Sequence, residues 1–312
     1  MNKYTTLKKT TPFFLSSLLT LLLLCSCEVS ETTTFTRLDP AETGIDFVNT
    51  TAETDSFNIL TNEYIYNGGG VGIGDFNQDG NQDIFLSGNE GPNKLYLNEG
   101  NWKFKDITEV ANVSGKDRWS GGVTVVDVNG DGKLDIYVCA SVTETSPIAT
   151  TNQLFLNQGN DLEGTPIFQD FAAQYGIADT SHNTQAAWLD YDLDGDLDLF
   201  LLVNRMVSNK RPNDFSRKVV DGSGSRTDKL YRQDRVGGQI TFTEVGKETG
   251  ILFQGFALAA TVCDLNRDGM PDLYVSNDYL SNDFAYLNTI DKNGKHYFKD
   301  IAPDLVKHTS YS

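Results

Sequence analysis

The sequence predicts an all-β fold, a β-propeller of four-stranded blades with about four blades present. Three observations support this prediction. A nine-residue acidic motif occurs four times, each copy lies between a run of small residues and an apolar β-like run, and two more strand-like runs with shared endings follow each copy. Four strands per unit, joined by turns and repeated along the chain, are typical of propeller blades.

The N-terminal segment, residues 1–26, has the layout of a secretory signal. It starts with basic residues, continues into an apolar stretch from Phe13 to Leu24 and contains no acidic residue. That stretch is short for a membrane span of about 20 residues. The segment ends Leu24-Cys25-Ser26-Cys27, which resembles the bacterial lipobox. Cys27, preceded by the small Ser26, is therefore the candidate lipidation site, with an ordinary cleaved signal as the alternative.

This interpretation predicts a localisation in the bacterial cell envelope, as an outer-membrane lipoprotein that is periplasmic or surface-exposed. Residues 27–34 would form a tether rich in Ser, Thr and Glu. The net charge of the whole chain is −18, from 25 basic and 43 acidic residues, and loss of Lys3, Lys8 and Lys9 with the signal makes it −21. This charge argues against nucleic acid as a partner and leaves the lipid anchor as the only predicted membrane contact.

The repeat units define the expected propeller domain, residues 35–312. Blades are predicted at about 70–108, 121–172, 184–246 and 256–303. The first run of each unit is rich in Gly and Ala, which fits the innermost strand, where neighbouring blades converge. The third and fourth runs share endings such as Leu-Tyr-Leu-Asn and Phe-Lys-Asp-Ile.

The acidic motif reads D-x-[DN]-x-D-G-x-x-D in all four copies, and it suits a hard cation. Positions 1, 3, 5 and 9 offer side-chain oxygens, position 7 can offer its backbone carbonyl, and Ca²⁺ takes about 6 to 8 such ligands. The glycine at position 6 allows the positive φ of a tight loop. An EF-hand would need Glu at position 12, where this chain has Leu or Val. We therefore expect about four Ca²⁺ sites, with these candidate ligands: Asp75, Asn77, Asp79, Asn81, Asp83; Asp127, Asn129, Asp131, Lys133, Asp135; Asp190, Asp192, Asp194, Asp196, Asp198; Asp264, Asn266, Asp268, Met270, Asp272.

With their flanking strands, these loops resemble FG-GAP/VCBS-type repeats, which also occur in integrin α-subunit propellers. The unit endings, followed by Gly-Ile at 176–177 and 250–251, are closer to bacterial envelope proteins of the ASPIC/UnbV-associated group. No Phe-Gly…Gly-Ala-Pro cage and no ASPIC/UnbV domain is present, so ligand recognition is not carried over from either relative. The resemblance implies an exported propeller that serves as a binding or scaffold module.

The predicted function is therefore a calcium-binding module for an extracellular or periplasmic protein or glycan. The alternative is a propeller-based polysaccharide lyase or hydrolase. An enzyme needs a convergent acid/base set, and the three histidines, His182, His296 and His308, fall in no recognisable pairing. We assign no catalytic residue. The pairs Asn277-Asp278 and Asn282-Asp283 could bind a ligand or simply form a turn.

The ring is expected to be incomplete. The run Phe35–Leu38 matches the fourth strand of a blade, whose first three strands we expect beyond Ser312, so the chain would be truncated at its C-terminus. The first and last blades should then expose apolar surface.

Overall fold

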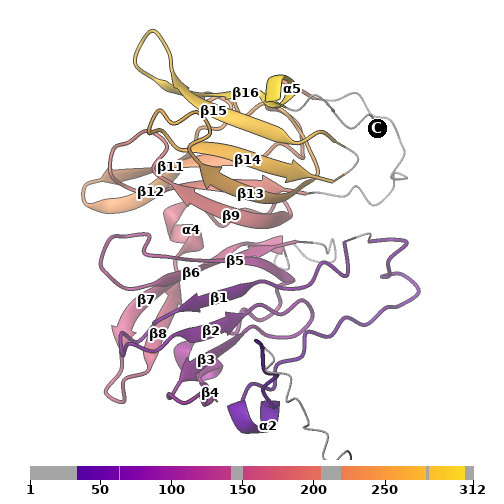
Figure 1. Ribbon diagram of the computed structural model, residues 1–312, viewed down its shortest axis with the longest axis vertical. Coiled ribbons are helices and arrows are strands. Elements are labelled where there is room, and N and C mark those ends of the chain that lie inside the picture. Colours follow the sequence, from indigo (N-terminus) through magenta and orange to yellow (C-terminus); the bar gives the residue numbers. More distant parts are fainter. Residues whose placement is uncertain (1–33, 63, 142–149, 205–218, 279–280, 306–312) are drawn as a thin grey trace, which may run out of the picture. The chain divides into compact units, whose positions relative to one another are not determined.

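The computed structural model describes residues 34–62, 64–141, 150–204, 219–278 and 281–305 (Figure 1). The chain divides into two units, Met1–Asp39 and Pro40–Ser312. The proposed signal segment, Cys27 and nearly all of the tether lie outside the described residues. Residues 35–38 form no strand, against expectation, because a strand needs a paired neighbour to satisfy its backbone groups. No helix within the described ranges is long and apolar enough to cross a membrane.

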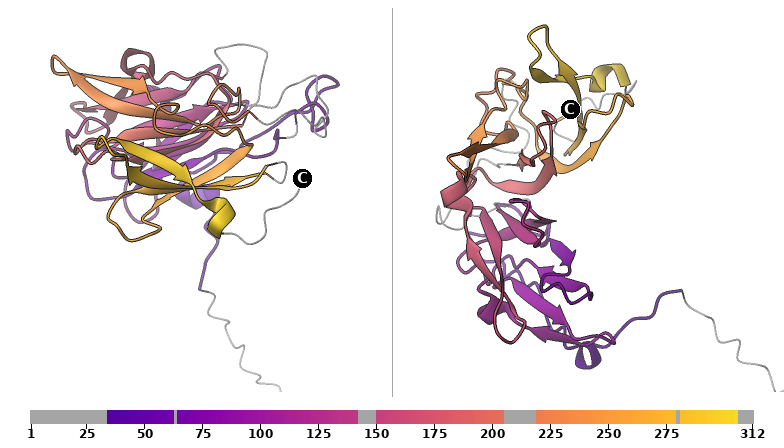
Figure 2. Two further views of the ribbon diagram at one scale, coloured as in Figure 1. Left: turned by 90° about the horizontal axis from the view of Figure 1, so that it is seen from above. Right: turned by 90° about the vertical axis from the view of Figure 1, so that its left-hand side faces the viewer.

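Four antiparallel sheets of four strands each make up the second unit, as predicted. Each sheet is one blade, and its strands pair in chain order (Figures 1 and 2). The strands of the four blades are β1 Val71–Gly74, β2 Asp83–Leu86, β3 Lys94–Asn98 and β4 Phe104–Asp106; β5 Ser120–Val126, β6 Asp135–Ala140, β7 Gln153–Asn160 and β8 Pro166–Asp170; β9 Asn183–Leu189, β10 Asp198–Val203, β11 Lys229–Val236 and β12 Gln239–Glu244; β13 Ala257–Cys263, β14 Asp272–Asn277, β15 Phe284–Ile290 and β16 His296–Asp300. The fold is therefore an all-β propeller arrangement.

The first strands of successive blades lie against one another, which explains their small residues. Gly70 donates its amide to the carbonyl of Gly121, and a Cβ atom at Gly72 would meet Val125 at 2.8 Å. Further along, the hydroxyl of Thr124 donates to the carbonyl of Ala186. The prediction that the Gly/Ala-rich strand is innermost is confirmed by these close approaches.

A short turn connects each blade to the next. The helices α3 Thr108–Ala111 and α4 Ala172–Tyr175 end at Asn112 and Gly176, both in the left-handed conformation, and α5 Ala302–Leu305 follows the fourth blade. Gly250, with φ of +91°, follows the third blade and leaves no room for a Cβ, which would lie 2.4 Å from the carbonyl oxygen of Phe298 in the next blade.

The segment before the first blade has the same turn. Helix α2, Pro40–Thr43, ends at Gly44, whose φ is +83°. A Cβ atom at Gly44 would lie 2.4 Å from the carbonyl oxygen of Phe104, which stands in the first blade where Phe298 stands in the fourth. Residues 40–44 therefore occupy, beside the first blade, the place that a connecting turn takes beside every later blade.

The hydrophobic core lies between blades. One cluster joins the first and second blades through residues such as Phe85 and Phe155, and a second joins the second and third through Tyr137 and Leu199. A third joins the third and fourth blades and includes Phe200. Each blade thus depends on its neighbour for burial, and none of these three clusters combines the first with the fourth.

The first and the last blade expose apolar side chains at positions whose counterparts in other blades are covered by a neighbouring blade. Val71 and Ile73 of β1 are 58% and 59% exposed, whereas Val123 and Val125 at the same positions of β5 pack against the first blade. In the fourth blade Leu265 is 39% exposed. The propeller is incomplete, as the sequence predicts, with its first and last blades uncovered on one face.

Candidate metal centres

Each acidic loop joins the first and second strands of a blade and is folded around its first aspartate. In the third loop the carboxylate of Asp190 accepts the backbone N–H groups of Asp194, at 3.0 Å, and Gly195, at 3.1 Å. The same two bonds recur in the other loops, from positions 5 and 6 to the aspartate of position 1. The loop glycines have φ between 83° and 96° and open space around a Cβ position, so they are needed for the backbone conformation.

Position 5 is held in the same way. Its carboxylate accepts the backbone N–H of position 7 in every loop, with donor–acceptor distances from 2.7 to 3.2 Å. In the first, second and fourth loops, the asparagine at position 3 accepts the amide of position 5. In these three loops the side chains at positions 1, 3 and 5 are therefore all held by backbone N–H groups of the loop itself.

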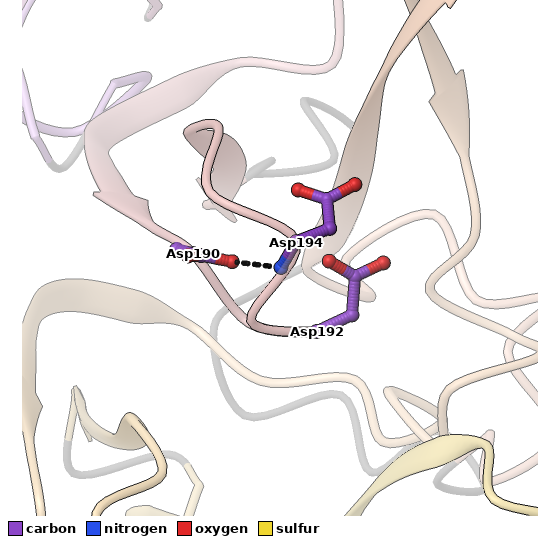
Figure 3. Close-up of side chains that lie close together, drawn as sticks. All are labelled: Asp190, Asp192 and Asp194. Carbon is purple, nitrogen blue, oxygen red and sulfur yellow. Dashed lines mark hydrogen bonds between the residues drawn. The ribbon is translucent and has the colours of Figure 1, made fainter.

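The third loop has the strongest concentration of charge. Ligand oxygens of Asp190, Asp192 and Asp194 all lie within 4.8 Å of one another, on the connection between β9 and β10 (Figure 3). Within the described residues this is the only group of three or more His, Cys, Asp or Glu side chains so placed. Burial and the neighbouring aspartates raise the pKa of Asp192. Close like charges of this kind are costly unless a cation compensates them.

Two oxygens in this loop are buried without a hydrogen-bond partner, Oδ1 of Asp192 and Oδ1 of Asp196. Burial and Asp194 also raise the pKa of Asp196. An unpaired buried carboxylate oxygen costs free energy, and a hard cation is the ligand that relieves this cost for several oxygens at once. The donor set of the third loop therefore fits Ca²⁺.

The ninth aspartate of every loop points into the blade and is fully buried. Its two oxygens each accept a backbone N–H, one from position 2 of the loop and one from the third strand. The donors are Phe76 and Asn98 for Asp83, Val128 and Asn157 for Asp135, Tyr191 and Gln233 for Asp198, and Leu265 and Asn288 for Asp272. This carboxylate ties the loop to the third strand, and its oxygens keep lone pairs for a cation.

Burial raises the pKa of these ninth aspartates, to about 6 for Asp83, about 7 for Asp135 and about 8 for Asp198, and also raises that of Asp272. Burial opposes the charged form. Repulsion from neighbouring aspartates adds to this effect, from positions 1 and 5 in the first, second and fourth loops and from positions 3 and 7 in the third. The second loop differs from the others because it has a lysine at position 7. The ammonium of Lys133 pairs with the carboxylate of Asp131. A cation in that loop has to displace this pair.

Asp278, Asp283 and His296, which the sequence offered as further candidates, have structural partners. Asp278 accepts the hydroxyl of Tyr64, and Asp283 accepts both the hydroxyl of Tyr274 and the amide of Asn277. The ring of His296 contacts Asn288. His182 is 8% exposed with φ of +63°, and His308 lies outside the described residues.

Comparison with known proteins supports the repeat type. Residues 75–138, which include the first two acidic loops, match the family described as FG-GAP-like repeat. The chain is 27% identical over 210 residues to cartilage acidic protein 1 of Mus musculus and 26% identical over 214 residues to that of Homo sapiens. These alignments cover 67% and 68% of this chain but only 29% and 28% of the relatives, so the chain spans less than a third of their length.

Among solved structures, a putative oxidoreductase (glucose dehydrogenase) from Thermus thermophilus aligns over 78% of this chain and 84% of its own. The sequence identity is 10% and the TM-score is 0.26, a similarity too low to bear on fold or activity. The family match therefore supports an FG-GAP-like repeat type for residues 75–138, and the four sheets form a propeller-like array.

Proposed function

We propose that this protein is a calcium-stabilised binding module of the bacterial cell envelope. The observation that carries the calcium assignment is the third loop, where three carboxylates converge and two buried oxygens lack partners. The other three loops repeat its backbone conformation and its hydrogen bonds. In each loop, side chains at positions 1, 3, 5 and 9 and the carbonyl of position 7 would hold one Ca²⁺.

Calcium in these loops would act on stability rather than on a substrate. The ion supplies positive charge among carboxylates whose pKa values are raised by burial and by one another. It also joins the start of the second strand to the end of the first. Because the blades bury their cores against each other, stabilising one hairpin stabilises its neighbours.

Within the proteins that carry such repeats, we propose that this chain belongs with the ASPIC/UnbV-associated envelope proteins. The support is the shared endings of the repeat units and the N-terminal leader. Lipidation at Cys27 would hold the module to the outer membrane. Fractionation of cells that express the Cys27→Ser variant tests this anchor. The account predicts loss of the protein from the membrane pellet, and a variant that stays in the pellet would refute it.

The partner we propose is an extracellular or periplasmic protein or glycan, recognised by loops at an end of the blades. The support is the repeat type together with the distant relationship to cartilage acidic protein 1. The test is the calcium-loaded full chain on glycan and protein arrays, followed by incubation of glycan hits with the protein. Saturable binding without product supports the module. Release of reducing ends or unsaturated uronate would establish the lyase or hydrolase alternative instead.

A further inference from the structure

The first acidic loop is tied to the second blade by two hydrogen bonds at its surface. The Nδ2 atom of Asn160, at the end of β7, donates to the carbonyl of Asn77 at 2.8 Å. The Nε2 atom of Gln78 donates to the carbonyl of Gly132, in the second acidic loop, also at 2.8 Å. Asn77 is position 3 of its loop and Gln78 is position 4, so two consecutive residues are bound to the neighbouring blade.

A third bond joins the same loop to β7 in the buried part of the interface. Asn157 is buried, and its Nδ2 atom donates to the carbonyl of Phe76 at 2.9 Å. Phe76 is position 2 of the first loop and is itself buried. Positions 2, 3 and 4 are therefore all held from the second blade, in addition to the bonds that fold the loop around its first aspartate.

The second and third loops have bonds of the same kind, each from the blade that follows. A terminal nitrogen of Arg235, on β11, donates to the carbonyl of Asn129, position 3 of the second loop, at 3.2 Å. The Nδ2 atom of Asn288, on β15, donates to the carbonyl of Tyr191, position 2 of the third loop, at 2.8 Å. The third strand of one blade thus supports the acidic loop of the blade before it.

The fourth loop has no following blade in the described part of the chain. Its positions 2 to 4 are Leu265, Asn266 and Arg267, and within the described ranges their hydrogen bonds all stay inside the fourth blade. Positions 1 to 6 of this loop are exposed, whereas positions 1 to 3 of the first loop are partly or fully buried. The fourth loop is therefore held only by its own blade.

The first and fourth loops are otherwise closely matched. Both have Asp, Asn, Asp and Asp at positions 1, 3, 5 and 9. In both, position 1 accepts the amides of positions 5 and 6, position 3 accepts the amide of position 5, and position 5 accepts that of position 7. The main differences are the support from a following blade and the residue at position 4, which is Gln78 in the first loop and Arg267 in the fourth.

Support from outside the loop matters because the loop holds several negative charges close together. Carboxylates that face one another repel, and a loop held only by its own bonds can open to separate them. Reversing this opening when a cation binds costs affinity, whereas a loop kept in its binding conformation avoids that cost. We propose that Asn160 and Gln78 are positioning residues for Ca²⁺ in the first loop, and that the fourth loop, with the same carboxylates but no such support, binds Ca²⁺ more weakly. This inference rests on the proposed calcium binding and concerns how a following blade regulates it.

The test follows the two loops separately during a calcium titration of the full chain. The amides of Gly80 and Gly269 donate to the first aspartates of their loops, Asp75 and Asp264, so their NMR signals in protein made with isotopically labelled glycine each report on one site. Asp75→Ala and Asp264→Ala assign the two signals, because each variant abolishes one calcium-dependent shift. We expect Gly80 to be half-saturated at a calcium concentration at least about fivefold lower than Gly269, the factor that one hydrogen bond typically provides.

Removal of the Asn160 bond should weaken the first site alone. In Asn160→Ala the half-saturating calcium concentration at Gly80 should rise about fivefold, while that at Gly269 stays the same. Asn160 is exposed, so the blade should remain folded, and Asn160→Gln, which keeps an amide donor, should recover part of the loss. Gln158→Ala is the matched control, because Gln158 is exposed on the same strand and donates to Leu156 within it. This control should change neither site.

Arg267→Gln tests whether position 4 explains the difference, since it gives the fourth loop the residue of the first. Gly269 should still report the weaker site in this variant. The proposal is overturned if the two sites saturate together, if Gly269 saturates first, if Arg267→Gln makes the sites equal, or if Asn160→Ala leaves Gly80 unchanged or shifts both glycines alike. If neither glycine shifts with calcium, calcium binding itself is refuted, so failure of the proposed function is distinguishable from failure of this inference.

Discussion

Asn157 is the clearest case in which one side chain joins two blades. It stands on β7 and is 1% exposed. Its Nδ2 donates to the carbonyl of Phe76 in the first blade at 2.9 Å and to that of Leu134 at 3.3 Å, while its Oδ1 accepts the amide of Gly159. Asn288 makes the equivalent bonds from the fourth blade to Tyr191 of the third.

Asn157→Ala should therefore destabilise the fold by more than the few side-chain atoms that it removes would suggest. It leaves the buried carbonyl of Phe76 without a partner, at about 1–3 kcal/mol, and removes further bonds of about 1 kcal/mol. Asn98 is the matched control, because it holds the same position in the first blade but bonds only within that blade, to Gln82 and Gly100. We expect a loss of about 2–4 kcal/mol for Asn157→Ala and about 1 kcal/mol for Asn98→Ala.

The assay is urea denaturation of both variants in saturating calcium, with the change in midpoint converted through the slope. Equal losses for the two variants would contradict the interblade argument, because the Phe76 bond is the difference between them. A second check is Asn288→Ala, which should match Asn157→Ala rather than Asn98→Ala.

Two further predictions concern single sites away from the metal loops. The pKa of Asp228, which is 2% exposed, is raised by burial to about 8, so the stability contributed by its neutral form is complete below about pH 4 and is lost as pH rises through 8. Asp228→Asn introduces the residue found at the equivalent positions 93 and 152. This variant should raise the melting temperature at pH 8 by more than at pH 5. An equal rise at the two pH values would refute the raised pKa of Asp228. Gly250→Ala should cost more than Gly294→Ala, because both glycines have positive φ but only Gly250 faces a backbone oxygen at 2.4 Å. Similar melting temperatures for these two variants would show that the contact between turn and blade is not tight.

The repeat could be predicted from the sequence because its signals are local. The acidic loop, the small residues of the first strand and the alternation of apolar residues each act within a few positions, and together they specify four blades and their order. The incomplete ring was predicted from an extra strand at Phe35–Leu38, which the structure does not form. What supports an open array instead is the exposure of Val71 and Ile73 in the first blade and of Leu265 in the fourth.

Contacts between distant residues could not be predicted in this way. The bond from Tyr64 to Asp278 depends on how a segment without regular structure crosses the blades, and no periodicity encodes it. Arg226 was visible only as one of several basic residues in the insertion at 206–227, and its stacking on Phe256 depends on the packing of β11 against the start of β13. For the ninth aspartates the sequence indicated a ligand role, whereas their bonds to the third strand required the register of the sheet.

If Ca²⁺ in the acidic loops stabilises the blades, thermal melting across a calcium titration shows it most directly. Each independent site should add about 3 kcal/mol at one hundred times its dissociation constant, so the melting temperature should rise with calcium and fall with excess EDTA. Asp194→Ala should lose part of this calcium-dependent gain. Asp161→Ala, which removes an aspartate from a β7–β8 turn that lacks the motif, should retain all of it. Equal melting in EDTA and in millimolar calcium would contradict the account.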